Sequence, residues 1–245
     1  MKWYRADLHI HSVLSPCSGL EMSPRNIMKR AKDKGLSLIS ITDHNSMANC
    51  AVYEKAAHEQ ELVFFWGMEI QTIEEIHLIV LFYDSEAAKV FDVQLYESLL
   101  PLKNNPDYFG DQVVIDEDEN IIRFEEKALI NSSRWTLEEV VKRLEILDAF
   151  FFPAHIDSDS YSIIGQLGFI PPELKFPALG ITAKCDLDRF LRNHRELSTY
   201  SFIRNSDAHY LEDIGSGYTD FYLQTPTIQE MRLACQKTRG RKNVI

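Results

Sequence analysis

Short apolar segments alternate with helical segments along most of the chain, and this alternation constrains the fold more than any other feature. The apolar run 36–42 follows a helix that we expect to begin at Ser23 and Pro24, and the run 62–66 follows a helical segment at 47–60. Serine suits the N-cap and proline the first helical position. Repeated strand–helix–strand units are typical of parallel sheets. The sequence therefore predicts an α/β fold.

Residues that can bind metal ions follow the predicted strands. They are His9, His11, Asp43, His44, Glu69, His155, Asp207 and His209. Side chains at the carboxyl ends of parallel strands converge on one mouth of a (β/α) barrel. An open doubly wound sheet, the alternative architecture, would spread them along an edge. The pattern favours a barrel-like fold.

The pair His9 and His11 ends the first predicted strand. Residues i and i+2 of an extended chain point to the same side, so both rings can hold one metal ion. The ordinary alternative is a pair of hydrogen-bonded or solvated histidines. Histidine and carboxylate ligands suit Zn, Mn or Fe. A carboxylate such as Glu69 can bridge two ions, and multi-metal sites suit phosphoester hydrolysis.

Composition limits the class of protein and its partners. A length of 245 residues fits one large domain over residues 1–245. The formal charge of −11 argues against broad binding to nucleic-acid phosphates. The four cysteines, Cys17, Cys50, Cys185 and Cys235, form no C-x-x-C pair, which favours a reducing compartment. With no apolar run long enough to span a bilayer and no signal-like start, we expect a soluble cytoplasmic protein without membrane contact.

The region 101–133 interrupts the alternation. Two extended segments, 112–115 and 121–124, flank the acidic stretch 116–120 and predict a β-hairpin. We expect this region to be an insertion within the domain, with a lid over the site as one role that it could serve.

Five segments, in this order, resemble the PHP (polymerase and histidinol phosphatase) family of metal-dependent phosphoesterases. They are Asp-Leu-His-Ile-His-Ser at 7–12, Ile-Thr-Asp-His-Asn at 41–45, Gly-Met-Glu-Ile at 67–70, Pro-Ala-His at 153–155 and Ser-Asp-Ala-His at 206–209. Any one of these segments alone is weak evidence, whereas the ordered set is specific and extends over nearly the whole chain. The resemblance implies a distorted, TIM-barrel-like seven-stranded (β/α) barrel with two or three divalent ions.

The resemblance also implies a ligand set for three ions. The first ion takes His9, His11, Glu69 and Asp207; the second shares Glu69 and adds His77 and His155; the third takes Cys17, His44 and His209. A hydroxide that bridges the metals is the implied nucleophile. Asp7 and Asp43 lie beside ligands, and we expect them to orient histidine rings.

Cys17 departs from the commoner family pattern, which has histidine or aspartate at this position. A thiolate binds Zn well and Mn or Mg less well. The alternative is a small packed thiol. Ser15-Pro16-Cys17 resembles one branch of the family, which favours the role of ligand.

The sequence is compatible with three functions. The leading hypothesis is hydrolysis of a phosphomonoester of a small molecule, such as a nucleotide or a sugar phosphate. The second is a phosphodiesterase or nuclease, which the acidic charge makes less favoured because polymers usually need a basic track. The third is a catalytically silent, metal-stabilised interaction module. The sequence specifies neither the substrate nor the oligomeric state.

Overall fold

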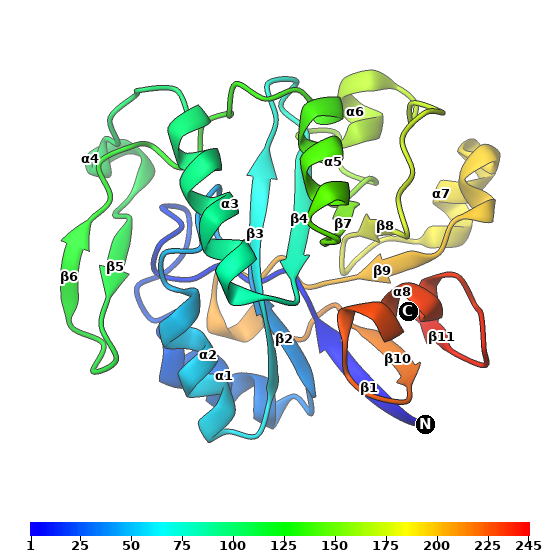
Figure 1. The fold of residues 1–245 in the computed structure, drawn as a ribbon, viewed down its shortest axis with the longest axis horizontal. Coiled ribbons are helices and arrows are strands. Elements are labelled where there is room, and N and C mark those ends of the chain that lie inside the picture. Colours follow the sequence, from blue (N-terminus) through cyan, green and yellow to red (C-terminus); the bar gives the residue numbers. More distant parts are fainter.

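A curled seven-stranded sheet forms the centre of the computed structural model, which describes residues 1–245 (Figure 1). Its strands follow the order β11-β10-β1-β2-β3-β4-β7. Their bounds are β1 Lys2–Asp7, β2 Leu38–Ile41, β3 Val63–Gln71, β4 His77–Phe82, β7 Phe150–Pro153, β10 Thr219–Leu223 and β11 Lys242–Val244. The α/β class is as predicted.

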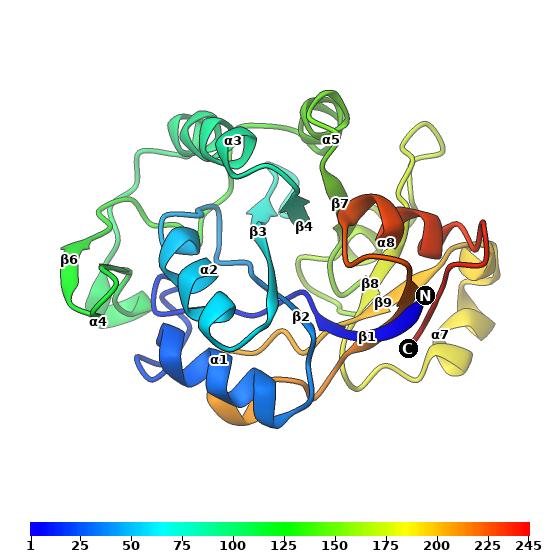
Figure 2. The same ribbon diagram turned by 60° about the horizontal axis from the view of Figure 1, so that its bottom comes forward.

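The helices lie outside this sheet. The longer ones are α1 Pro24–Asp33, α2 Cys50–Glu59, α3 Ser85–Ser98, α5 Leu137–Ile146 and α8 Ile228–Cys235; the shorter ones are α4 Pro106–Phe109, α6 Ile163–Leu167 and α7 Leu187–Asn193, with single turns at Arg195–Thr199 and Leu211–Asp213. In Figure 2, α3 and α5 lie together on one side of β3 and β4. Thr136 caps α5 in a reciprocal capping box with Glu139. No helix has both the length and the apolar character needed to cross a membrane.

Strand direction differs from the expected parallel arrangement. Strand β2 is parallel to β1 and β3, but β4 is antiparallel to both β3 and β7. Gln71 at the end of β3 pairs with His77 at the start of β4. The amino end of β4 therefore lies beside the carboxyl end of β3, so His77 reaches the mouth from the beginning of its strand.

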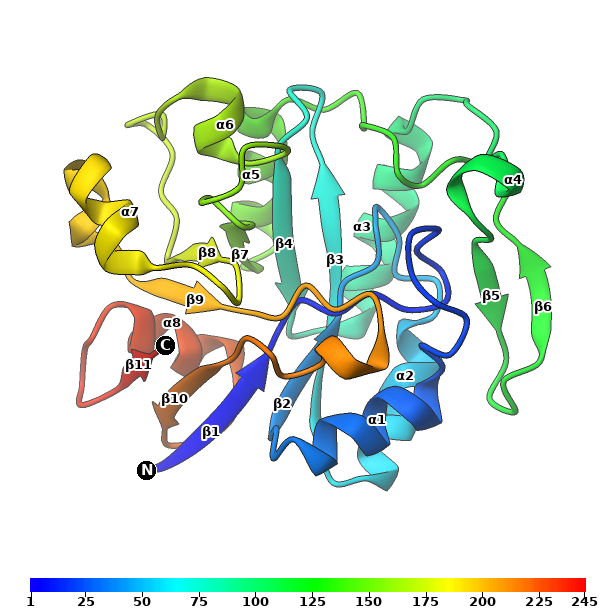
Figure 3. The same ribbon diagram turned by 180° about the vertical axis from the view of Figure 1, so that it is seen from behind.

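Two further strands do not join the seven-stranded sheet and instead form a separate pair. They are β8 Leu179–Ile181 and β9 Phe202–Arg204, which are parallel to each other. The second edge of β1 is occupied by β10, from Lys2 to Ala6, so β9 has no place there. Beyond the end of β1, Ile10 bridges Ala208, which brings the segment after β9 to the mouth (Figure 3).

Apolar side chains cover both faces of the central strands. Along β4, Leu78, Val80 and Phe82 belong to the cluster that includes residues of α3 and α5, whereas Ile79 and Leu81 belong to a second cluster. Burial on both faces explains the continuous apolar runs in the sequence. Gly67 permits close packing of β3, because a Cβ there would lie 2.4 Å from Ser40 Oγ and 2.9 Å from Val80 O.

The hairpin expected at 112–124 is present as β5 Val113–Ile115 and β6 Ile121–Phe124, which are antiparallel. It lies at the edge of the molecule away from β11, next to α2 and α3 (Figures 1 and 3). The Val113 amide donates to Val13 O, so the hairpin packs on the loop that follows His11. A lid role remains a prediction.

Candidate metal centre

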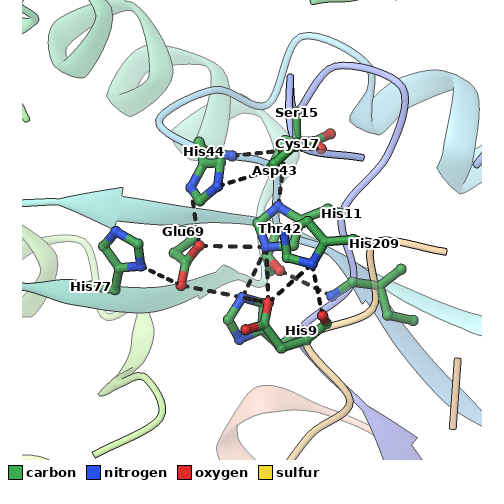
Figure 4. A network of polar contacts seen from close by, with 12 residues as sticks. His9, His11, Ser15, Cys17, Thr42, Asp43, His44, Glu69, His77 and His209 are labelled. Atoms are coloured by element: carbon green, nitrogen blue, oxygen red, sulfur yellow. Dashed lines mark hydrogen bonds and ion pairs between the residues drawn. The ribbon is translucent and has the colours of Figure 1, made fainter. Parts of the chain in front are cut away.

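The carboxylate of Glu69 lies at the centre of a histidine cluster (Figure 4). Glu69 is buried on β3, where the antiparallel partner β4 and the segments after β1, β2 and β7 converge. Five ring nitrogens lie 3.0–3.5 Å from its two oxygens: His9 Nε2, His11 Nε2, His44 Nδ1, His77 Nδ1 and His155 Nε2. Burial opposes ionisation, but His77, His9 and the other rings hold the pKa of Glu69 well below its usual range.

The Asp207 carboxylate forms a second meeting point of predicted ligands. Its Oδ1 lies 3.1 Å from His9 Nε2 and 3.2 Å from His11 Nε2, and these two nitrogens lie 3.1 Å apart. Although burial opposes ionisation, His9 and His11 lower the pKa of Asp207 far below that of a free carboxyl. Three predicted ligands from opposite ends of the chain therefore meet around one point.

Cys17 meets two histidines at the edge of the cluster. Its Sγ lies 3.4 Å from His44 Nε2. Burial opposes ionisation of the thiol, but hydrogen bonds with His209 and His44 outweigh it and lower the pKa of Cys17 to about 6. A thiol with a low pKa is a better metal ligand than an inert packed cysteine.

The cluster contains more nitrogen and oxygen lone pairs than hydrogen bonds can satisfy. Metal ions could bind these lone pairs. The Nδ1 atoms of His44, His77 and His155 are buried without a hydrogen-bond partner, although the first two lie 3.1 and 3.0 Å from Glu69 oxygens. Three groups have ligand atoms within 4.8 Å of one another: His9, His11 and Glu69; His44, Glu69 and His77; His11, His44 and His209. Imidazole, carboxylate and thiol donors fit Zn, Mn or Fe.

Asp43 acts on the cluster through Ser15. The Ser15 hydroxyl donates to Asp43 Oδ1 at 2.6 Å and lies 2.9 Å from His11 Nδ1. Because the single hydroxyl proton goes to Asp43, His11 Nδ1 must donate to Ser15 Oγ. The lone pair of His11 Nε2 then faces Asp207 and Glu69, as a metal ligand requires.

Asp7 does not orient a histidine as expected. Its carboxylate accepts hydrogen bonds from the backbone amides of Ser206 and Gly215. Burial raises the pKa of Asp7 to about 6, despite these hydrogen bonds. Asp7 therefore helps to fix the loop that carries Asp207, together with the bridge between Ile10 and Ala208.

Gln71 is a functional candidate that the sequence reasoning missed. Its Oε1 lies 3.1 Å from His77 Nε2, and its Nε2 donates to Ser132 Oγ. The amide oxygen is therefore the atom facing His77, so His77 donates from Nε2 and keeps the Nδ1 lone pair toward Glu69. Gln71 follows Glu69 by two residues on a strand, and this same-face spacing was the available signal.

Three residues in or beside the cluster have strained backbone conformations. Asn45, His155 and Asp207 have positive φ angles of 50°, 29° and 53°. Residues other than glycine rarely adopt this region, and such conformations gather at functional sites. Asn45 is held by donating its side-chain amide to the carbonyls of Leu129 and Asn131.

A cavity of about 230 Å³ opens onto these ligands. Its lining consists of six predicted ligands and four other residues: His44, Glu69, His77, His155, Asp207 and His209, with Ser158, Ser160, Tyr161 and Thr182. No lysine or arginine belongs to this lining. The structure thus brings all nine predicted ligands into one region, where their donor atoms could hold divalent metal ions.

The chain belongs to the PHP family. The model of the PHP domain matches residues 7–134, and that of the PHP-associated region matches residues 196–239. The first match covers the segments that carry His9, His11, Cys17, His44, Glu69 and His77. The protein is therefore a member of a family of metal-dependent phosphoesterases.

Similar proteins include two bacterial relatives and one archaeal structure. The uncharacterized protein YqxK of Bacillus subtilis is 32% identical over 109 residues, which are 41% of this chain and 27% of YqxK. A 5'-3' exoribonuclease of Haemophilus influenzae is 33% identical over 87 residues, which are 34% of this chain and 31% of that protein. The lesion-specific endonuclease Q of Pyrococcus furiosus has the same fold, with a TM-score of 0.74, 20% identity and coverage of 100% of this chain and 58% of that chain. The chain thus spans less than two thirds of the length of each of these proteins.

Proposed function

We propose that this chain hydrolyses a phosphomonoester of a small molecule, either a nucleotide or a sugar phosphate, at the histidine–carboxylate cluster. The observation that carries this proposal is the buried Glu69 carboxylate with five histidine nitrogens within 3.5 Å of it. Such a carboxylate can bridge two ions, and bridged ions suit phosphoester hydrolysis.

We assign the ligands as the family resemblance implies. His9, His11, Glu69 and Asp207 hold the first ion, Glu69, His77 and His155 the second, and Cys17, His44 and His209 a third. When bound, divalent ions acidify a water molecule and neutralise charge on the phosphate. The chain itself fixes the ligand geometry: Ser15 orients His11, and Gln71 orients His77.

The cavity favours a single phosphate over a polymer. A strand of nucleic acid brings several phosphates, and these need a basic track. The lining has no lysine or arginine, and the chain carries a net charge of −11. Metal ions are then the groups available to neutralise one phosphate within about 230 Å³.

A nuclease that removes terminal nucleotides is the second candidate. It is favoured by the 33% identity over 87 residues to a 5'-3' exoribonuclease. Such an enzyme needs to place only one scissile phosphate in the cavity at a time, with the rest of the strand outside it.

The test is a panel of phosphoesters assayed with Mn, Zn, Mg and Fe. AMP and ribose 5-phosphate represent monoesters, bis-p-nitrophenyl phosphate represents diesters, and a 5'-phosphorylated RNA oligomer represents a polymer. We expect monoester hydrolysis that His9→Ala and Asp207→Ala abolish with the fold retained by circular dichroism. His58→Ala, on the exposed face of α2, is the matched control and should behave as wild type.

Each outcome of the panel is decisive. Cleavage of the oligomer in preference to AMP would favour the nuclease. Metal binding without hydrolysis of any ester would favour the silent interaction module. Wild-type turnover by either alanine variant would refute the assignment of the first ion.

A further inference from the structure

The wall of the cavity that carries no predicted metal ligand is formed by two loops. Ser158, Ser160 and Tyr161 come from the loop after β7, and Thr182 directly follows β8. The Thr182 hydroxyl is already engaged, because it donates to Asp157 Oδ2 at 2.6 Å. The groups on this wall that remain for a ligand are two serine hydroxyls and one aromatic ring.

Tyr161 is held in an unusual conformation at this position. Its φ is +56°, which bulky residues rarely adopt. Its carbonyl accepts the backbone amide of His77 at 2.8 Å, and its ring lies parallel to the His77 ring, with centroids 4.8 Å apart and an interplanar angle of 14°. One face of the phenol ring therefore lies against His77, which Figure 4 shows at the left of the cluster. Tyr161 makes this contact from a rarely populated backbone conformation.

Tyr161 nevertheless stays accessible to solvent. Tyr161 is 43% exposed, although its neighbour His77 is only 6% exposed. A ring that served only to seal His77 from water would be expected to bury both faces against apolar neighbours. Tyr161 instead stacks on the predicted ligand His77 with one ring face, and the residue remains partly open beside the cavity.

We propose that Tyr161 is a stacking platform for a planar nitrogenous base, so that the phosphoester cleaved here is that of a nucleotide rather than of a sugar. This inference rests on the proposed function and deepens it. A base stacks on any aromatic face, and Ser158 and Ser160 can donate to or accept from the edge of the base or the ribose. A sugar phosphate has no aromatic ring with which to stack on the phenol.

The size of the cavity agrees with a ligand whose phosphate is enclosed and whose base lies outside. About 230 Å³ is less than the roughly 300–1,000 Å³ of sites that enclose a drug-sized ligand. The enclosed part therefore takes the phosphate and the atoms next to it, and the base lies at the rim, where Tyr161 is exposed. The same rim position accepts a free nucleotide or the terminal nucleotide of a strand.

The experiment compares two non-hydrolysable ligands on the metal-loaded full chain. These are the phosphonate analogues of AMP and of ribose 5-phosphate, in which a P–C bond replaces the ester P–O bond, titrated by calorimetry. Stacking of one base predicts that the wild type binds the AMP analogue roughly tenfold more tightly. Tyr161→Ala should remove this preference, and Tyr161→Phe and Tyr161→Trp should retain it.

Tyr83→Ala is the matched control, because Tyr83 is 68% exposed and follows the end of β4 that lies away from the cluster. It should keep the wild-type preference. Metal content, measured by mass spectrometry, should be the same in all variants. A Tyr161→Ala variant that loses metal while keeping the preference for the base would indicate a structural cover for His77 and would overturn the proposal.

Failure of this inference is distinguishable from failure of the proposed function. Equal binding of the two analogues by an enzyme that hydrolyses monoesters refutes the role of Tyr161 alone. If neither analogue binds and no ester is cleaved, the proposed function fails as well.

Discussion

Replacing Ser15 with alanine tests how the chain prepares a metal ligand. Ser15 is fully buried, and its hydroxyl contacts three groups: His11 Nδ1 at 2.9 Å, Asp43 Oδ1 at 2.6 Å and the His44 amide at 3.3 Å. Alanine removes all three contacts with the loss of a single oxygen atom. His11 then lacks the acceptor that fixes its tautomer.

The expected magnitude follows from what each group retains. Asp43 keeps the Ser12 amide at 2.7 Å, and the His44 contact is long, so His11 Nδ1 is the main group left unsatisfied. One buried unsatisfied group costs about 1–3 kcal/mol. Loss of a group that orients a ligand typically weakens metal binding by about 10–100-fold. Ser15→Ala should therefore lower both stability and metal affinity.

Urea unfolding of the metal-free protein measures the first effect, and competition with a chromophoric chelator measures the second. Ser18→Ala is the matched control in the same loop, because Ser18 Oγ is buried with no hydrogen-bond partner. It should leave metal affinity unchanged and should not lower stability. Wild-type metal affinity in Ser15→Ala, or an equal loss in Ser18→Ala, would refute the proposed orientation of His11.

Three further predictions concern other parts of the molecule. Cys17→Ser should lower metal content at one of the three proposed sites, as measured by elemental analysis; unchanged stoichiometry would favour the packing role. Chelation should lower the free energy of unfolding by about 2.7 kcal/mol per ion, for ions present at 100 times their Kd; an unchanged urea midpoint would contradict a metal centre. Burial raises the pKa of Asp92 to about 6, so its contribution to stability falls as pH rises from about 4 to 6. Asp92→Asn, which keeps an acceptor for the Met47 amide, should stabilise the protein by on the order of 2 kcal/mol at pH 8 and by less near pH 4 in urea unfolding.

Local patterns accounted for the elements and for most of the candidate site. Ser23 and Pro24 mark the beginning of α1, Thr136 and Glu139 form the capping box of α5, and the acidic turn separates β5 from β6. These features depend on neighbouring residues, which a sequence displays directly. The ordered motifs likewise contained seven of the nine predicted ligands that lie together in the structure, and the family resemblance added His77 and Cys17.

Local sequence patterns could not predict contacts between segments that are distant in the chain. The hydrogen bonds of Asp7 to the 206–215 loop and the stacking of Tyr161 on His77 depend on how the chain returns to β1 and β4. Strand direction was also undetermined, because an apolar run buried on both faces has the same composition in parallel and antiparallel sheets.

The sequence by itself determined the α/β class, the hairpin and the set of histidine, carboxylate and cysteine side chains available for metal ions. Only the tertiary structure decided that β4 runs antiparallel to β3, so that His77 lies beside Gln71 at the mouth. It also decided that β10 rather than β9 pairs with β1. The physical reason is that hydrophobic burial fixes which residues face inward, whereas the edge that a strand pairs with depends on the competition among all strands for the same backbone hydrogen bonds.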